Sequence, residues 1–164
     1  MSAEEAPIIM ILGSPADRSW AERIAAALEQ FGLSSETYVA SAHKTPEWLL
    51  DMLKIWEGRQ PHVYITVAGR SNALSGFVDA QVTAPVIACP PPSESFAGLD
   101  ILSSLRMPRG VAPVVVLEPE NAALAAAKML GLLLPEIQTR VAERQAAERD
   151  RVLGLESGVG SRES

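Results

Sequence analysis

The apolar stretch Pro7-Ile8-Ile9-Met10-Ile11-Leu12, followed at once by Gly13-Ser14-Pro15, decides the fold of this chain. A short run without polar residues is typical of a strand that is buried on both faces, as the strands of a parallel sheet are. From about Ala16 to Phe31 the apolar residues recur every three or four positions, which predicts a helix that ends at Gly32. The first unit is therefore a strand, a loop and a helix.

The same unit recurs along the rest of the chain. Strands that alternate with helices indicate right-handed crossovers and a parallel sheet with helices on both faces. We expect one α/β domain over residues 1–155, an extra C-terminal helix, and a disordered Gly-, Ser- and Arg-rich tail over 156–164. The further strands are expected at about 36–40, 62–67, 85–89 and 112–117, and the further helices at about 46–57, 72–81, 98–104, 121–133 and 135–153.

Bulk properties exclude several classes of protein. The chain has 164 residues, of which 48% are hydrophobic, so it can bury a core of its own. The formal net charge is −6 and there is no basic stripe, which argues against a nucleic acid as partner. The acidic N-terminus lacks the basic start of a signal peptide, and no apolar run approaches the ~18 residues of a membrane span. We therefore expect a cytoplasmic protein that does not bind a membrane.

The single cysteine, Cys89, lies inside an apolar run. One cysteine cannot form an internal disulfide or a cysteine-rich metal site. We interpret it as a small buried hydrophobic residue, with a reactive thiol as the alternative.

Three loops carry polar residues that chemistry can use, and each follows a predicted strand. They are Gly13–Asp17, Ser41–Thr45 and Ala68–Asn72. In a parallel sheet the carboxyl ends of the strands lie at one edge, where open α/β sheets bind their ligands. We therefore expect the three loops to line one crevice, with main-chain amides, hydroxyls, one carboxylate, one imidazole and two cations.

His43 and Lys44 put a titratable imidazole beside a fixed positive charge, just before the predicted helix start at Thr45-Pro46. Histidine can take and return a proton near neutral pH, and lysine binds a phosphate as a point charge. The pair favours acid–base chemistry on an anionic substrate. A structural histidine and a solvated lysine are the alternatives. The other histidine, His62, is interpreted as a surface or structural residue.

The other two loops offer contacts for an anion and a sugar. Gly13 and Ser14 precede a helix, whose unpaired N–H groups suit a phosphate, and Asp17 can accept hydrogen bonds from ribose hydroxyls. Helix capping is the alternative for Ser14 and Asp17. Arg70 can pair with a carboxylate or phosphate through its planar guanidinium group, or it can form a surface salt bridge.

The order of these motifs and the separations between them match those of a known family. The motifs are Gly13-Ser14-x-x-Asp17, Ser41-Ala42-His43-Lys44-Thr45-Pro46, Ala68-Gly69-Arg70-Ser71-Asn72, Met107-Pro108-Arg109-Gly110 and Asn121-Ala122-Ala123-Leu124. The set resembles the aminoimidazole ribonucleotide (AIR) carboxylase family of purine biosynthesis, over about residues 7–152. The resemblance implies a flavodoxin-like three-layer αβα sandwich with a five-stranded parallel sheet. It also implies a homo-octamer with sites at the subunit interfaces.

The resemblance distinguishes between two branches of the family. The mutase branch moves a carboxyl group from the N5-carboxylated ribonucleotide to ring carbon C4, and it usually carries Ser-Ala-His-Arg and a later Gly-Gly-Ala-Ala-His run. This chain has Lys44 in place of the arginine, and Gly69-Arg70-Ser71-Asn72 where the mutases have the loop of the second histidine. It looks like the other branch, which carboxylates AIR reversibly with CO2 to 4-carboxy-AIR, without ATP, biotin, another cofactor or a metal.

The resemblance also implies a role for each site residue. His43 would carry the proton of ring carbon C4. The phosphate and the ribose would be held by the first two loops, and the base and CO2 would lie near the third loop. The expected substrate-binding residues are Gly13, Ser14, Asp17, Ser41, Lys44, Gly69, Arg70 and Ser71.

Two other functions remain as alternatives. One is the mutase reaction on the same fold. The other is a flavodoxin-like nucleotide-binding module without enzymatic activity. A receiver module would need an acidic pair after the first strand and an aspartate at the end of a central strand, but this chain has Gly13-Ser14 and Ala68-Gly69 at those places.

Overall fold

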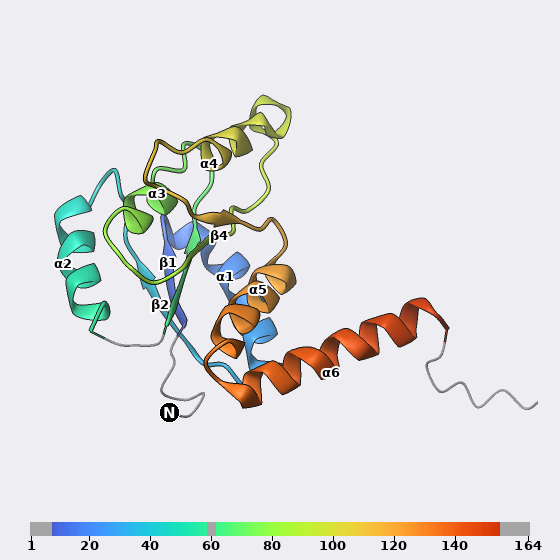
Figure 1. The fold of residues 1–164 in the computed structure, drawn as a ribbon. Coiled ribbons are helices and arrows are strands. Elements are labelled where there is room, and N and C mark those ends of the chain that lie inside the picture. Colours follow the sequence, from blue (N-terminus) through green and yellow to red (C-terminus); the bar gives the residue numbers. More distant parts are fainter. Residues whose placement is uncertain (1–7, 59–61, 155–164) are drawn as a thin grey trace, which may run out of the picture.

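Among residues 8–58 and 62–154, which the computed structural model describes, five parallel strands form a sheet in the order β2-β1-β3-β4-β5 (Figure 1). This order is that of a flavodoxin-like sheet, and it confirms the predicted α/β architecture. The strands are β1 (Ile8–Leu12), β2 (Ser35–Val39), β3 (Val63–Val67), β4 (Val86–Ala88) and β5 (Val114–Val115).

Helices cover both faces of the sheet. One face carries α1 (Arg18–Glu29) and α5 (Pro119–Gly131), and the other carries α2 (Pro46–Trp56) and α3 (Leu74–Asp79). The predicted extra helix is α6 (Pro135–Val152), which packs against α5 near its start and then projects from the sandwich (Figure 1). The shorter segments are η2 (Pro15–Asp17), η3 (Ser95–Ile101) and α4 (Leu102–Leu105). The predicted tail, 156–164, lies outside the described residues.

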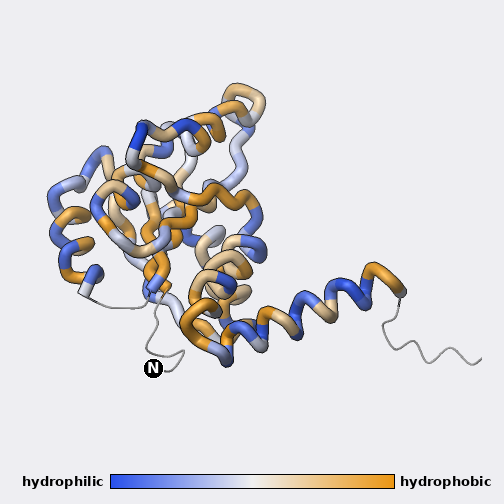
Figure 2. Tube along the Cα trace, viewed as in Figure 1, coloured by the Kyte–Doolittle hydropathy of each residue, from blue (hydrophilic) through white to orange (hydrophobic). Residues whose placement is uncertain are grey.

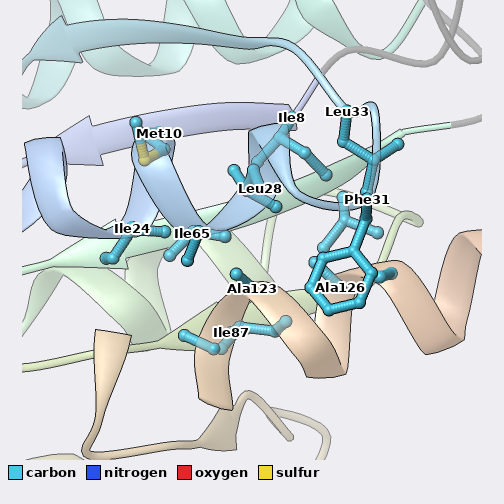
Figure 3. Packing of buried hydrophobic residues seen from close by; sticks show 14 of the residues in the cluster. Ile8, Met10, Ile24, Leu28, Phe31, Leu33, Ile65, Ile87, Ala123 and Ala126 are labelled. Carbon is cyan, nitrogen blue, oxygen red and sulfur yellow. The ribbon is translucent and has the colours of Figure 1, made fainter. Parts of the chain in front are cut away.

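The central strands are apolar throughout because side chains on both of their faces are buried. Ile9 and Ile11 of β1 point toward Leu49 and Leu53 of α2. The intervening residues of β1 face the opposite side, where alanines on α5 let that helix approach the sheet closely. Figure 2 shows the resulting hydrophobic centre beside the mostly hydrophilic α6. Figure 3 shows this second side, with Ile8, Met10 and Ile65 of the sheet against Ile24 and Leu28 of α1 and Ala123 and Ala126 of α5.

Several local predictions are wrong in detail. The fifth strand pairs over only two residues, because β5 is the edge of the sheet and Pro113, just before it, has no N–H to donate. Trp48, an apolar residue near the start of α2, is 44% exposed. The buried positions of α2 are Leu49, Leu53 and Trp56, and Trp48 lies about 100° around the helix from Leu49.

Two polar residues also differ from expectation. Thr45 is the N-cap residue of α2, as its place before Pro46 predicts, but its hydroxyl accepts a hydrogen bond from the Ser41 N–H (3.0 Å) and makes no capping bond to the helix. His62 is not a surface residue, since it is 2% exposed and its Nε2 lies 3.3 Å from Oε1 of Glu57. The structural role expected for His62 is confirmed. Cys89 is buried, as predicted.

Candidate active site

The carboxyl ends of β1, β2 and β3 open into a cavity of about 680 Å³. It lies where the strand order reverses, because β1 is flanked by β2 on one side and β3 on the other. The three loops that the sequence singles out all reach it. The lining includes each of the nine residues selected from the sequence: Gly13, Ser14, Asp17, Ser41, His43, Lys44, Gly69, Arg70 and Ser71.

In the first loop, one residue caps a helix and another leaves its carboxylate free of any capping bond. Oγ of Ser14 accepts a hydrogen bond from the Ala16 N–H (3.2 Å) and so caps η2, while Asp17, at the start of α1, makes no side-chain capping bond. Partial burial raises the pKa of the Asp17 carboxyl group. A hydrogen bond from the Ser14 main chain and the positive charge of Arg70 act in the opposite direction. Asp17 of the first loop and Arg70 of the third therefore interact electrostatically.

Small residues keep the first and third loops in contact. The Gly13 N–H donates a hydrogen bond to the Val67 carbonyl (2.9 Å), which continues the β1–β3 ladder to the edge of the cavity. A Cβ atom on Gly13 would lie only 3.0 Å from Cβ of Ala68. Glycine at this position therefore lets the two loops meet at the floor of the site.

The second loop is a tight turn that presents His43 and Lys44. The Ser41 carbonyl accepts hydrogen bonds from the main-chain N–H groups of Lys44 (3.2 Å) and Thr45 (2.8 Å). Oγ of Ser41 lies 3.3 Å from the main-chain nitrogen of Lys44. Both the imidazole and the ammonium group are exposed at the rim of the cavity. The turn fixes the backbone, and the two side chains remain accessible to a ligand.

The third loop holds an arginine in an uncommon conformation. Arg70 has φ of 59°, in the left-handed region that residues other than glycine rarely adopt, at a cost of about 1–3 kcal/mol. Oγ of Ser103 lies 2.9 Å from the Arg70 carbonyl oxygen and accepts a hydrogen bond from the Asn72 N–H (3.0 Å). Asn72 is buried, and its amide donates to Oγ of Ser104 (2.8 Å). Contacts from α4 thus stabilise the loop.

A fourth segment contributes to the cavity, and the sequence reasoning did not assign it to the site. It follows β4, at the same edge of the sheet as the three other loops. Its three successive prolines, Pro90, Pro91 and Pro92, remove main-chain N–H donors and so exclude a helix or a central strand. Its position after a parallel strand was the signal that could have placed it. The cavity residues from this segment are Pro91, Pro92, Ser93 and Ser95.

The charges that line the cavity suit an anionic ligand. Of the described residues in its wall, Asp17 carries a carboxylate, while Lys44 and Arg70 carry positive charges. Hydroxyl groups of Ser14, Ser41 and neighbouring serines lie between them. This donor-rich wall fits a phosphorylated molecule with hydroxyl groups.

Comparison with known proteins identifies the family. Residues 7–151 match the family model of AIR carboxylase. The chain belongs to the AIR carboxylase family. It is 50% identical over 147 residues to the phosphoribosylaminoimidazole carboxylase of Treponema denticola, covering 89% of this chain and 92% of the relative. It is 49% identical over 144 residues to the Archaeoglobus fulgidus protein of the same name, covering 88% and 79%.

A solved structure supports the same assignment. The crystal structure of Treponema denticola PurE matches this AIR carboxylase family member with a TM-score of 0.90 and 47% identity, over 95% of this chain and 99% of that one. The chain is thus an enzyme of the carboxylase class that acts in purine biosynthesis. Within residues 8–58 and 62–154, none of the helices has the length and hydropathy that a bilayer crossing requires.

The raised pKa of Asp17 leads to a prediction about Asp17→Asn. The folded protein binds this proton more tightly than the unfolded chain, so the free energy of unfolding falls as the pH rises through the titration of Asp17. The variant lacks this penalty. We expect its melting temperature to match wild type at about pH 3 and to equal or exceed it at about pH 7. We also expect a higher KM for the nucleotide.

The matched control is Asp51→Asn, which removes an exposed carboxylate of α2 that pairs with Lys54. It should leave KM unchanged. An unchanged KM in Asp17→Asn would remove Asp17 from the substrate site, and a lower melting temperature at neutral pH would contradict the penalty from burial.

Proposed function

We propose that this chain carboxylates AIR directly and reversibly with CO2, without ATP or biotin, and that His43 carries the proton. The observation that carries the proposal is the cavity at the carboxyl edge of the sheet. It collects an imidazole, a carboxylate, two cations and several hydroxyl groups from loops that are distant in sequence. Its volume of about 680 Å³ lies within the usual range of small-molecule sites.

The nucleotide portion of AIR has a counterpart for each of its polar groups. The phosphate would be held by the hydroxyl groups of Ser14 and Ser41 and by the positive charge of Lys44. The ribose hydroxyls would donate to the carboxylate of Asp17. The base would then lie toward the third loop, near Gly69 and Arg70 and within reach of the His43 imidazole.

The chemistry requires one carbon–carbon bond and one proton transfer. Ring carbon C4 of AIR is electron-rich and attacks the carbon of CO2, and one C=O bond of CO2 opens to give a carboxylate. C4 then carries both the carboxylate and its original proton. His43 removes that proton, and the C–H electrons restore the aromatic ring. In the reverse reaction, the same imidazole returns the proton and CO2 leaves.

Features of this chain support direct carboxylation over the mutase reaction. The chain has two histidines in all. His62 lies just before β3, at the edge of the sheet opposite the cavity, and is buried there. The third loop contributes Arg70 where the mutases usually place a second histidine. Among the described residues that line the cavity, His43 is therefore the one imidazole, and one such proton carrier is enough for the CO2 reaction. The mutase reaction remains the second candidate.

We also propose that the chain forms a homo-octamer with its sites at subunit interfaces. A groove of about 690 Å³ beside the cavity shares Arg70, Ser71 and Ser95 with it. Phe96 and Leu99 in this groove are 83% and 61% exposed, a large apolar surface for a monomer. A neighbouring subunit on this surface would also shield the exposed His43 from water. Sedimentation should give the mass of eight chains of 17.5 kDa, and a monomer would contradict the proposal.

The direct test supplies AIR and dissolved CO2 without ATP. We expect 4-carboxy-AIR to form at a rate that depends on CO2, and we expect the N5-carboxylated ribonucleotide to be a poor substrate. His43→Asn should lower kcat by about 10²–10⁴-fold, the usual contribution of general acid–base catalysis, while nucleotide affinity is retained. Product formation is followed by ultraviolet absorbance, and affinity by calorimetry.

Each arm of this test can fail separately. Turnover of the N5-carboxylated compound with none from AIR and CO2 would assign the chain to the mutase branch. A His43→Asn enzyme with wild-type kcat would show that another group carries the proton.

A further inference from the structure

We infer that Ser103 is a positioning residue for carboxylation, which shapes the third loop so that it holds the newly formed carboxylate. Ser103 lies on α4, far in sequence from the loop, and it does not line the cavity itself. The inference rests on the proposed function, because it concerns a step of that reaction. It assigns to α4 a role that the sequence motifs do not indicate.

The Ser103 hydroxyl contacts the loop on both sides of Ser71. Its oxygen lies 2.9 Å from the Arg70 carbonyl oxygen and 2.8 Å from the Asp100 carbonyl oxygen, and it accepts a hydrogen bond from the Asn72 N–H (3.0 Å). One side chain thus bridges the peptide groups before and after Ser71. This spacing holds the loop in a narrow bend.

A buried side chain anchors the far end of the same bend. Asn72 is 4% exposed, its Nδ2 donates to Oγ of Ser104 (2.8 Å), and its Oδ1 accepts from the Ser75 N–H (3.3 Å). Ser104 and Ser75 are buried as well. Asn72 is therefore fixed to α3 and α4, and the conformational freedom left to the loop lies at Gly69, Arg70 and Ser71. Ser103 is the residue that removes this freedom.

The left-handed conformation of Arg70 is the feature that needs this support. A φ of 59° is intrinsically unfavourable for arginine, so contacts with other residues must hold Arg70 in this conformation. The conformation sets the direction of the guanidinium group and of the neighbouring main-chain N–H groups. Arg70 lines the cavity beside Gly69 and Ser71, and it is close enough to Asp17 to affect the pKa of that carboxyl group. Loss of the Ser103 hydroxyl would let the bend relax while the fold stays intact.

The position of the loop indicates which species it binds best. AIR has no carboxylate on C4, whereas the transition state and 4-carboxy-AIR do. A guanidinium group and N–H donors at that position would stabilise the transition state and the product, and they would contribute little to the binding of AIR itself. Weakening them should lower kcat for carboxylation and raise KM for 4-carboxy-AIR. KM for AIR and kcat for decarboxylation should stay near wild type.

The experiment compares Ser103→Ala with Ser103→Thr in the full-length enzyme. Both directions of the reaction are measured, together with amide hydrogen exchange over residues 69–74. In Ser103→Ala we expect kcat for carboxylation to fall, and KM for 4-carboxy-AIR to rise, by about 10–10²-fold, the scale of a 1 Å misplacement. The Asn72 segment should exchange faster. Ser103→Thr keeps the hydroxyl group and should restore both properties.

Several results would overturn the inference. Unchanged hydrogen exchange in Ser103→Ala would show that the hydroxyl does not hold the loop. Faster exchange with unchanged kinetics would show that the bend has no part in the reaction. A lower melting temperature with KM raised equally for AIR and for 4-carboxy-AIR would show a general structural role.

Failure of the proposed function gives a different pattern. A wild-type enzyme that does not convert AIR and CO2 would overturn that function and the kinetic part of this inference together. Hydrogen exchange would still report whether Ser103 holds the loop, because that measurement needs no substrate.

Discussion

The burial of β1 and β3 on both faces is the constraint on which the rest of this enzyme depends. Strands covered on both sides by helices must be apolar along their whole length, and parallel strands must all end at one edge. Polar residues are thereby confined to the loops that follow the strands. Those loops meet at the reversal of strand order, so the requirement to bury the sheet also assembles the site.

The site departs from what stability alone would favour. Asp17 loses hydration when its carboxylate is partly buried, and Arg70 holds a backbone conformation that is unfavourable for arginine. Contacts with neighbouring segments sustain both features. Gly13 allows the first and third loops to meet, and α4 fixes the third loop through its serines. Backbone strain and unfavourable charge burial at one cavity are typical of a functional site.

Much of this arrangement could be predicted from the sequence, and the parts that could not have a common cause. The continuous apolar run of β1, the stop at Gly32 and the loops around His43 and Arg70 are local signals. The contacts of Ser103 with the Arg70 segment join residues that are distant in sequence. Such contacts leave no period or motif in a single chain. The proline segment after β4 joins the site through its position at the edge of the sheet, which its composition alone does not indicate.

The central claim is that one imidazole at this edge moves a single proton to and from the ring carbon that takes up CO2. It is tested most directly by a crystal structure of the enzyme with AIR bound. The account predicts a ring nitrogen of His43 within about 3–3.5 Å of C4, the range of reacting atoms. If C4 lies well beyond the reach of His43 in every subunit, from its own chain and from each neighbour, the account is contradicted.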